Sequence, residues 1–158
     1  MKKIIIAIDG PAASGKGRIA KYLSKKWKLK HLDSGILYRR LAKILIDKNV
    51  KLNNISEIKK IIKKQKTFSF RKHIRLRDEN VGNFASKIAV FSFIRDFINK
   101  LQRDIVYKYY KNKGFVIDGR DIGSVVFKEA DLKLYIDVNE INRAKRRYKQ
   151  LIDTDEKS

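Results

Sequence analysis

The chain has 158 residues, of which 43% are hydrophobic and 10% aromatic, which suits one folded domain and excludes a disordered chain. It has no cysteine, which excludes a disulfide framework and a cysteine nucleophile, and we assign neither a ligand nor a base role to its two histidines, His31 and His73. The formal net charge of +22 fits either nucleic-acid binding or a compositional bias that also attracts small anions. We favour the bias, because the lysines are spread along the chain, and do not expect nucleic acid as a partner.

The first third of the chain predicts alternating strands and helices. A continuous apolar run over residues 4–8 is typical of a strand buried on both faces, and helical spacing follows over 16–27. A short strand over 29–32 and a helix over 34–47 come next. This order predicts an α/β fold with a doubly wound parallel sheet and helices on both faces. The first apolar run ends at Asp9, too short for a signal sequence or a membrane span, so we expect a cytoplasmic protein.

The middle of the chain has a different character. Isoleucines over residues 55–62 predict a short basic helix, and residues 67–70 and 74–77 have strand character. The chain contains no repeat and no low-complexity linker. We therefore expect a single domain over residues 1–158, with a small helical and β insertion at about 48–82.

The remaining segments return to the α/β pattern. Residues 83–111 predict helix, with a break near Ser92. Two further strands are predicted, one over 115–117 and one over 132–138. Asn139 is then positioned to cap a final helix.

The segment between the first strand and the first helix fits the phosphate-binding pattern G-x-x-x-x-G-K. Its residues are Gly10, Pro11, Ala12, Ala13, Ser14, Gly15 and Lys16, followed by Gly17 and Arg18. Small residues let backbone N–H groups converge on one anion, and the following helix adds the positive end of its dipole. Lys16 supplies a mobile charge for the β- and γ-phosphates. The pattern therefore predicts a nucleoside-triphosphate site in a P-loop NTPase-like fold.

Two residues after the lysine depart from the usual loop. Position 17 is glycine, so the hydroxyl that usually touches Mg²⁺ is missing there. Nucleotide kinases often have threonine at the next position, where this chain has Arg18, which cannot ligate a cation. The guanidinium of Arg18 could instead approach a phosphate or face solvent.

Three further segments carry a family resemblance. They read L-D-S-G at residues 32–35 with Tyr38 and Arg39, A-S-K-I-A at 85–89 before Arg95, and D-G-R-D-I-G-S-V-V-F at 118–127. Together with the opening I-D-G-P-A-A-S-G-K-G, they resemble the cytidylate kinase family of P-loop nucleoside monophosphate kinases. The resemblance runs from residue 3 to about residue 151.

The resemblance implies that ATP, accompanied by Mg²⁺, gives its γ-phosphoryl group to CMP or dCMP in pyrimidine nucleotide metabolism. It implies catalytic roles for Lys16 and Arg120, and Asp33 could orient Mg²⁺ through water or act as a cap. The implied acceptor-binding residues are Ser34, Arg39 and Arg120 at the phosphate, and Ser86, Arg95 and Asp121 at the cytosine. Arginine forks match phosphate oxygens, and a carboxylate can accept a hydrogen bond from the cytosine amino group. We expect no dedicated general base, because positioning and charge supply most of the catalysis of phosphoryl transfer.

Each of these residues also has an ordinary interpretation. Arg39 could face solvent, Arg95 could form a surface ion pair, and Ser86 could be a plain helix residue. Ligands of α/β proteins bind at the carboxyl ends of strands, so we favour the functional interpretation for Arg39, Arg120 and Asp121. The insertion at about 48–82 would then bind the acceptor nucleotide.

Members of the family normally continue past the last predicted helix to an arginine-rich lid, a strand and a helix. The resemblance implies that the lid and last strand are absent from these 158 residues, with Arg143, Arg146 and Arg147 as a partial substitute. Four functions stay open: a CMP kinase, a kinase for UMP or AMP, a truncated remnant that binds nucleotide with weak or no activity, and a basic nucleic-acid-binding module. We expect ATP and CMP or dCMP as partners, no membrane, and a monomer.

Overall fold

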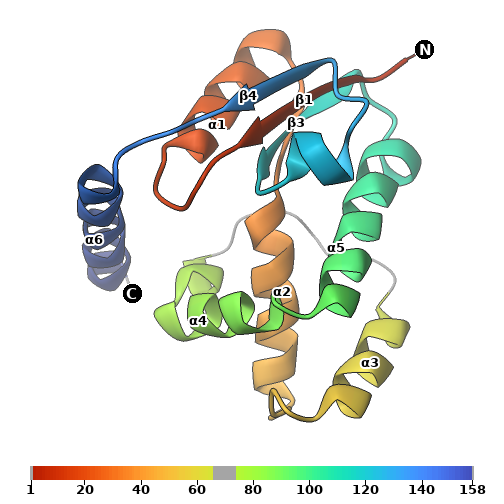
Figure 1. The fold of residues 1–158 in the computed structure, drawn as a ribbon, viewed down its shortest axis with the longest axis vertical. Coiled ribbons are helices and arrows are strands. Elements are labelled where there is room, and N and C mark those ends of the chain that lie inside the picture. Colours follow the sequence, from red (N-terminus) through yellow and green to blue (C-terminus); the bar gives the residue numbers. More distant parts are fainter. Residues whose placement is uncertain (1, 66–73, 158) are drawn as a thin grey trace. The chain divides into compact units, whose positions relative to one another are not determined.

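A computed structural model of the chain describes residues 2–65 and 74–157 (Figure 1). The chain divides into two units, which are described separately. The sheet unit comprises Met1–Ser34 and Gln102–Ser158, and the helical unit comprises Gly35–Leu101. Within the described ranges, no helix is both long enough and apolar enough to cross a membrane.

The sheet unit is built on four parallel strands in the order β2-β3-β1-β4. They are β1 (Ile4–Asp9), β2 (Lys30–Asp33), β3 (Gly114–Gly119) and β4 (Leu132–Tyr135). In Figure 1, β4, β1 and β3 run side by side. Asp9 is in register with Gly119, and Asp33 with Asp118. The carboxyl ends of β1, β2 and β3 therefore lie at one edge of the sheet, as expected for the predicted doubly wound α/β fold, which is confirmed.

Both faces of this sheet are covered within the sheet unit. One face packs against α1 (Lys16–Trp27), in a cluster made of Ile6, Ile8, Ala20, Leu29 and Val116. Because side chains alternate along a strand, Ile5 and Phe115 face the other way. There Tyr110 packs edge-on against Phe115, with ring centroids 6.1 Å apart. Burial on both faces explains why β1 and β3 are continuous apolar runs rather than alternating ones.

Further helical segments of the sheet unit follow α1. They are the π-helices η2 (Ile105–Tyr109) and η3 (Ile122–Val126), and the long helix α6 (Glu140–Lys157). The segment η3 packs against β1 and β3. The predicted cap of the last helix is confirmed, because Oδ1 of Asn139 accepts a hydrogen bond from the N–H of Asn142 at 2.9 Å.

Strand β4 is shorter than the sequence predicts, ending at Tyr135 instead of residue 138. Among the described strands its only neighbour is β1, and Asp9, the last residue of β1, is in register with Tyr135. The N–H of Ile136 still donates to the carbonyl of Asp9 at 2.8 Å. Beyond that bond β4 has no strand to pair with in the described part of the sheet, so its apolar pattern continues without strand structure.

The helical unit holds the chain between β2 and the return to the sheet. Its elements are α2 (Ser34–Asp47) apart from its first residue, α3 (Ile55–Lys64), the 3₁₀-helix η1 (Ile74–Arg77), α4 (Glu79–Ile88) and most of α5 (Ser92–Asp104). The largest fully buried side chains of this unit are Leu37, Leu41, Leu45, Ile58, Ile88, Ile94 and Ile98. The predicted helices over 34–47 and 55–62 are confirmed, as is the break near Ser92, which separates α4 from α5.

Residues 74–77 form η1 rather than the strand predicted from the sequence. The carbonyl of Leu76 accepts a hydrogen bond from Nη1 of Arg39 at 2.6 Å, so a side chain takes the place of a strand partner. Asp78 then caps α4, because its carboxylate accepts the N–H of Asn80 at 2.9 Å. The other predicted strand, over 67–70, lies outside the described residues. The single domain and its insertion at 48–82 stay predictions.

Candidate active site

The phosphate loop, residues 10–15, lies between the end of β1 and the start of α1. Ala13 and Gly15 have φ angles of 56° and 90°, and these left-handed residues turn the chain into the helix. Gly15, at the N-cap of α1, has no side chain that could cap the first N–H groups of the helix. Ser14 is buried, and its Oγ has no hydrogen-bond partner within the described residues. A helix N-terminus with uncapped N–H groups and an unsatisfied hydroxyl is suited to an anion.

The chain packs closely against a neighbouring segment at Gly10, but not at Gly17. A Cβ on Gly10 would lie 2.5 Å from the carbonyl oxygen of Ile136, so only glycine fits there. A Cβ on Gly17 would lie 3.7 Å from Oδ2 of Asp118, an ordinary contact distance. Arg18, the residue that replaces the usual threonine, is exposed. Its side chain is therefore available to solvent, which was one of the two predicted alternatives.

Lys16 folds back over the loop. Its Nζ donates a hydrogen bond to the carbonyl of Pro11 at 3.1 Å. The pKa of Lys16 lies below its ordinary value, mainly because the side chain is buried. The carboxylates of Asp118 and Asp33 oppose this shift, and the guanidinium of Arg120 adds to it. The ammonium thus lies among charges of both signs, and its role in binding phosphate stays a prediction.

The carboxylate of Asp118, at the end of β3, is buried beneath the start of α1. One of its oxygens, Oδ1, contacts Nε2 of His31 on β2. The sequence reasoning missed this pair, since it gave His31 no ligand or base role and gave Asp118 no functional role of its own. The pair could have been found only from the strand register. Val116 is the register partner of His31, and Asp118 is the next residue of β3 on the same face of the sheet.

The D-G-R-D turn follows β3. Arg120 and Asp121 are exposed, and Asp121 has a left-handed φ of 57°. The hydroxyl of Ser34 donates to the carbonyl of Asp118 at 3.0 Å. A Cβ on Gly119 would lie 1.9 Å from Oγ of Ser34, so this close approach requires glycine. The turn is therefore packed directly against Ser34, the first residue of α2, which belongs to the sheet unit.

The carboxylate of Asp9 holds the other side of this turn. Its oxygens accept the N–H groups of Ile122 and Gly123 at 2.6 and 2.9 Å. Asp9 immediately precedes the phosphate loop, so the loop and the D-G-R-D turn are tied together. The sequence reasoning missed this role, because nothing in the local spacing pairs Asp9 with a turn more than a hundred residues later.

A basic residue of α6 also contacts the loop. Nη1 of Arg146 donates to the carbonyl of Ser14 at 3.0 Å, and it lies 3.1 Å from the position of a Cβ on Gly15. Of the three arginines named as a partial substitute for a lid, Arg146 is thus at the phosphate loop.

The remaining predicted acceptor residues belong to the helical unit. Nη2 of Arg39 lies 3.0 Å from the position of a Cβ on Gly82 of α4, and Nη1 donates to the carbonyl of Leu76 in η1. Nη1 of Arg95 donates to the carbonyls of Ala89 and Val90 at 2.9 and 2.8 Å, and so caps the end of α4. Ser86 is exposed on α4. Within their unit all three therefore lie on or against α4, and their acceptor roles stay predictions.

The acidic residues at the strand ends fit a magnesium ion bound mainly by a nucleotide. Within the described residues, no group of three or more His, Cys, Asp or Glu side chains is arranged to hold a metal by itself. Mg²⁺ in nucleotide sites takes one or two carboxylates and otherwise phosphate oxygens and water. Asp33 and Asp118 are register partners on β2 and β3, and the charge of each carboxylate raises the pKa of Lys16. These two carboxylates are therefore the ones that fit.

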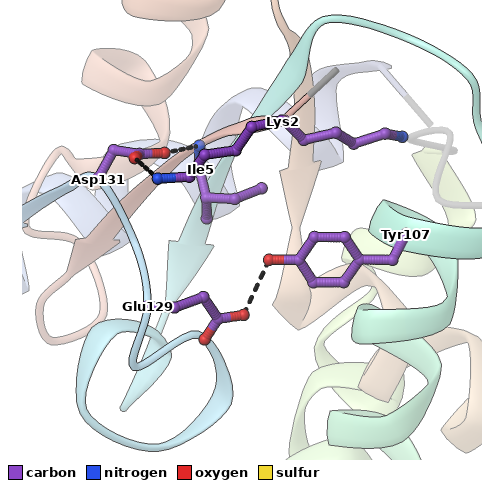
Figure 2. Close-up of a pocket in the computed structure, with 6 residues that line it drawn as sticks. Lys2, Ile5, Tyr107, Glu129 and Asp131 are labelled. Atoms are coloured by element: carbon purple, nitrogen blue, oxygen red, sulfur yellow. Dashed lines mark hydrogen bonds and ion pairs between the residues drawn. The ribbon is translucent and has the colours of Figure 1, made fainter.

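A separate cavity of about 390 Å³ lies elsewhere in the sheet unit (Figure 2). Its lining residues are Lys2, Lys3, Ile5, Tyr107, Glu129 and Asp131. In Figure 2 the carboxylate of Asp131 reaches both Lys2 and the N–H of Ile5, and Tyr107 donates to Glu129. Because this cavity is at the amino end of β1, and the phosphate loop follows the carboxyl end, the cavity is not part of the candidate site.

Comparison with known proteins agrees with the motifs. A family model described as cytidylate kinase matches residues 6–158. A cytidylate kinase of Bartonella quintana (strain Toulouse) is 41% identical over 152 residues, which cover 96% of this chain and 69% of that protein. A cytidylate kinase of Rickettsia rickettsii (strain Sheila Smith) is 44% identical over 146 residues, covering 92% of this chain and 64% of that protein.

The chain thus spans about two thirds of the length of these curated relatives. The crystal structure of TT1252 from Thermus thermophilus has a TM-score of 0.49 and 18% identity, and covers 92% of this chain and 71% of that one. The matches to the two named relatives each cover more than nine tenths of this chain, and the family model matches residues 6–158. On these grounds, the chain belongs to the cytidylate kinase family.

Proposed function

We propose that this protein transfers the γ-phosphoryl group of ATP to CMP or dCMP, forming ADP and CDP or dCDP. The observation that carries the proposal is the pairing of the phosphate loop with the D-G-R-D turn at the carboxyl ends of adjacent strands. The loop supplies donors for a triphosphate, and the turn supplies an exposed arginine for the group in transfer. Its named relatives are cytidylate kinases.

Charge stabilisation is the main contribution of the protein in this proposal. Lys16 and the N-terminal end of α1 bind the β- and γ-phosphates, and Arg120 stabilises the charge that spreads over the transferring group. Mg²⁺, when bound with ATP, neutralises phosphate charge, and Asp118 and Asp33 are the side chains that would hold it, directly or through water. No side chain is given the role of a general base, because a loose transition state needs little proton transfer.

Recognition of the acceptor is divided between its phosphate and its base. Ser34, Arg39 and Arg120 bind the phosphate, and Ser86, Arg95 and Asp121 bind the cytosine. Arginine has five N–H donors, so the helix-capping bonds of Arg95 leave donors for a base. The segment at about 48–82 is proposed as the acceptor-binding insertion. We further propose a cytoplasmic monomer, which size-exclusion chromatography with light scattering would test.

The proposal is tested by a coupled ADP-release assay with ATP and Mg²⁺, adding CMP, dCMP, UMP or AMP in turn. CMP and dCMP should stimulate ADP release strongly, and UMP and AMP weakly, because the base-reading groups match the amino edge of cytosine. Equal stimulation by UMP or AMP would contradict the assigned acceptor. Stimulation by no acceptor would contradict the activity itself.

A second candidate function is nucleotide binding without efficient transfer. Gly17 and the exposed Arg18 favour it, because neither can supply the hydroxyl ligand for Mg²⁺. This candidate predicts ATP binding by titration calorimetry with no acceptor-stimulated turnover in the same assay. An Arg18→Thr variant should then gain turnover, whereas it should change little if the first proposal holds.

A further inference from the structure

Asp9 ends β1 and makes two hydrogen bonds to a distant turn. One oxygen accepts the N–H of Ile122 at 2.6 Å, and the other accepts the N–H of Gly123 at 2.9 Å. Both donors are backbone groups in the first turn of η3, so the carboxylate caps a helical segment that begins more than a hundred residues later. Each oxygen has its own donor, which makes the contact well defined in orientation.

The N-terminal end of η3 is not capped by the residue that precedes it in the chain. The residue in the cap position, Asp121, makes no side-chain cap bond and has a left-handed φ of 57°. Local chemistry therefore does not satisfy these N–H groups, and a non-glycine residue is held in a sparsely populated conformation. Asp9 supplies the missing acceptors from β1. The carbonyl of Asp121 also accepts the N–H groups of Val125 and Val126 at 3.0 and 3.1 Å, and the bonds of Asp9 hold the next two residues, Ile122 and Gly123.

The position of Asp9 in the chain gives the contact its significance. Asp9 is covalently joined to Gly10, the first residue of the phosphate loop, and is in register with Gly119, the residue before Arg120. One side chain thus connects the two backbone segments that carry Lys16 and Arg120. A small displacement between these segments would separate the two positive charges that the transferring group needs together.

We propose that Asp9 is a positioning residue: its two bonds to the backbone of η3 hold Arg120 at the correct place relative to the phosphate loop. Asp9 does not contact substrate, and its effect on phosphoryl transfer passes through Arg120. This inference rests on the proposed function of the site, and it adds a residue to which the motif assignments give no role.

The test uses Asp9→Asn, which keeps the size of the side chain and replaces one acceptor oxygen with a donor. Asp131→Asn is the matched control. Asp131 is also a carboxylate of the sheet unit that accepts a backbone N–H, that of Ile5 at 2.8 Å, but at the other end of β1 (Figure 2). Thermal unfolding, ATP affinity by titration calorimetry, and acceptor-dependent kcat are measured for both variants.

We expect Asp9→Asn to lower kcat about 10- to 100-fold, as for a displaced catalytic group, while the Kd for ATP changes by less than about threefold. Asp131→Asn should leave both quantities unchanged, whatever it does to thermal stability. Loss of kcat in Asp131→Asn equal to that in Asp9→Asn would overturn the proposal, since general destabilisation would then explain both. Weakened ATP binding that accounts for the whole effect would also overturn it.

A double-mutant cycle separates positioning of Arg120 from other effects. In an Arg120→Ala background, measured at high enzyme concentration, adding Asp9→Asn should cost less than about threefold, because the group it positions is gone. The full loss in that background would refute the coupling.

One readout does not depend on activity. Amide hydrogen exchange at Ile122 and Gly123 should accelerate in Asp9→Asn and stay unchanged in Asp131→Asn. If the parent protein shows no acceptor-dependent turnover, the proposed function fails, and this exchange measurement still decides whether Asp9 holds the turn. Unchanged protection of both amides would overturn the inference.

Discussion

Lys16 is the residue on which the proposed phosphate site depends most. Lys16→Ala should lower acceptor-dependent turnover by about 10²–10³-fold, the loss typical of removing a preorganised group that stabilises transition-state charge. The matched control is Lys21→Ala, an exposed lysine on the same helix, which should leave turnover unchanged. Thermal unfolding should show no loss of stability in Lys16→Ala, because burial of the ammonium is unfavourable in the free protein. Near-normal turnover would contradict the assigned role.

The protonation of Lys16 gives a second prediction. Burial lowers its pKa below the ordinary value of 10.5 in the free protein, and bound phosphates would raise the pKa again by favouring the charged form. At an alkaline pH between these two pKa values, ATP binding should therefore take up a proton. Well below both pKa values the amine is charged in either state, and it should take up none. Titration calorimetry in buffers of different ionisation enthalpy measures this uptake.

The control for that measurement is the Lys16→Ala variant, in which the alkaline proton uptake should disappear. Uptake that persists in the variant would assign the proton to another group. Since the prediction concerns binding alone, it holds whether or not the protein transfers phosphate efficiently.

At the residue scale, the sequence permits a prediction where the chemistry is local. The glycines, Ser14 and Lys16 form a recognisable pattern because consecutive residues build the phosphate loop. Asp9 and His31 were missed because their partners, on η3 and β3, are distant in the chain and are brought near only by strand register. Long-range contacts of this kind leave no spacing signal, and they depend on which strands become neighbours.

At the scale of elements, the packing of β3 against the start of α2 gives a stability prediction. Gly119→Ala would place a Cβ 1.9 Å from Oγ of Ser34, so it should lower the free energy of unfolding by roughly 1–3 kcal/mol through overpacking. The penalty should be smaller in a Ser34→Ala background, where the nearest conflicting atom is removed. Denaturant-induced unfolding of the two single variants and the double variant measures the coupling.

A second glycine provides the control. Gly17 lies in α1, and an added Cβ would meet only Oδ2 of Asp118 at an ordinary 3.7 Å. Gly17→Ala should therefore be neutral or stabilise by up to about 1 kcal/mol, because alanine favours the helix. Equal tolerance of Gly119→Ala and Gly17→Ala would contradict the close packing of Gly119 against Ser34.

The elements themselves were predictable to the extent that periodicity determines them. The alternating strands and helices could be predicted because buried strands and amphipathic helices have different apolar patterns in the sequence. β4 was predicted too long, since its apolar residues continue beyond the end of β1, its only partner. Residues 74–77 were predicted as strand, but the Arg39 bond to Leu76 and the Asp78 cap favour a helical turn instead. In both cases tertiary pairing overrode the local pattern.

At the scale of the whole molecule, the dominant feature is charge. The chain carries 39 lysines and arginines against 17 acidic residues, and the proposed ligands are all anions. A strongly positive field raises the local concentration of anions and speeds their association, and salt screens it over a Debye length of about 8 Å at physiological ionic strength. The field acts on encounter rather than on the bound complex, where salt would screen the proposed close contacts of Lys16 and Arg120 far less.

The salt dependence of the reaction should therefore appear in kcat/KM for CMP and much less in kcat. Between 20 and 200 mM KCl we expect kcat/KM to fall about three- to tenfold, because salt weakens the electrostatic steering of small anions. Steady-state kinetics at constant Mg²⁺ and ATP measures both parameters. Cytidine is the matched uncharged ligand, and its weak competition against CMP should show little salt trend of its own. A kcat that falls in parallel with kcat/KM would contradict steering, because salt would then be acting on the catalytic contacts or on the fold.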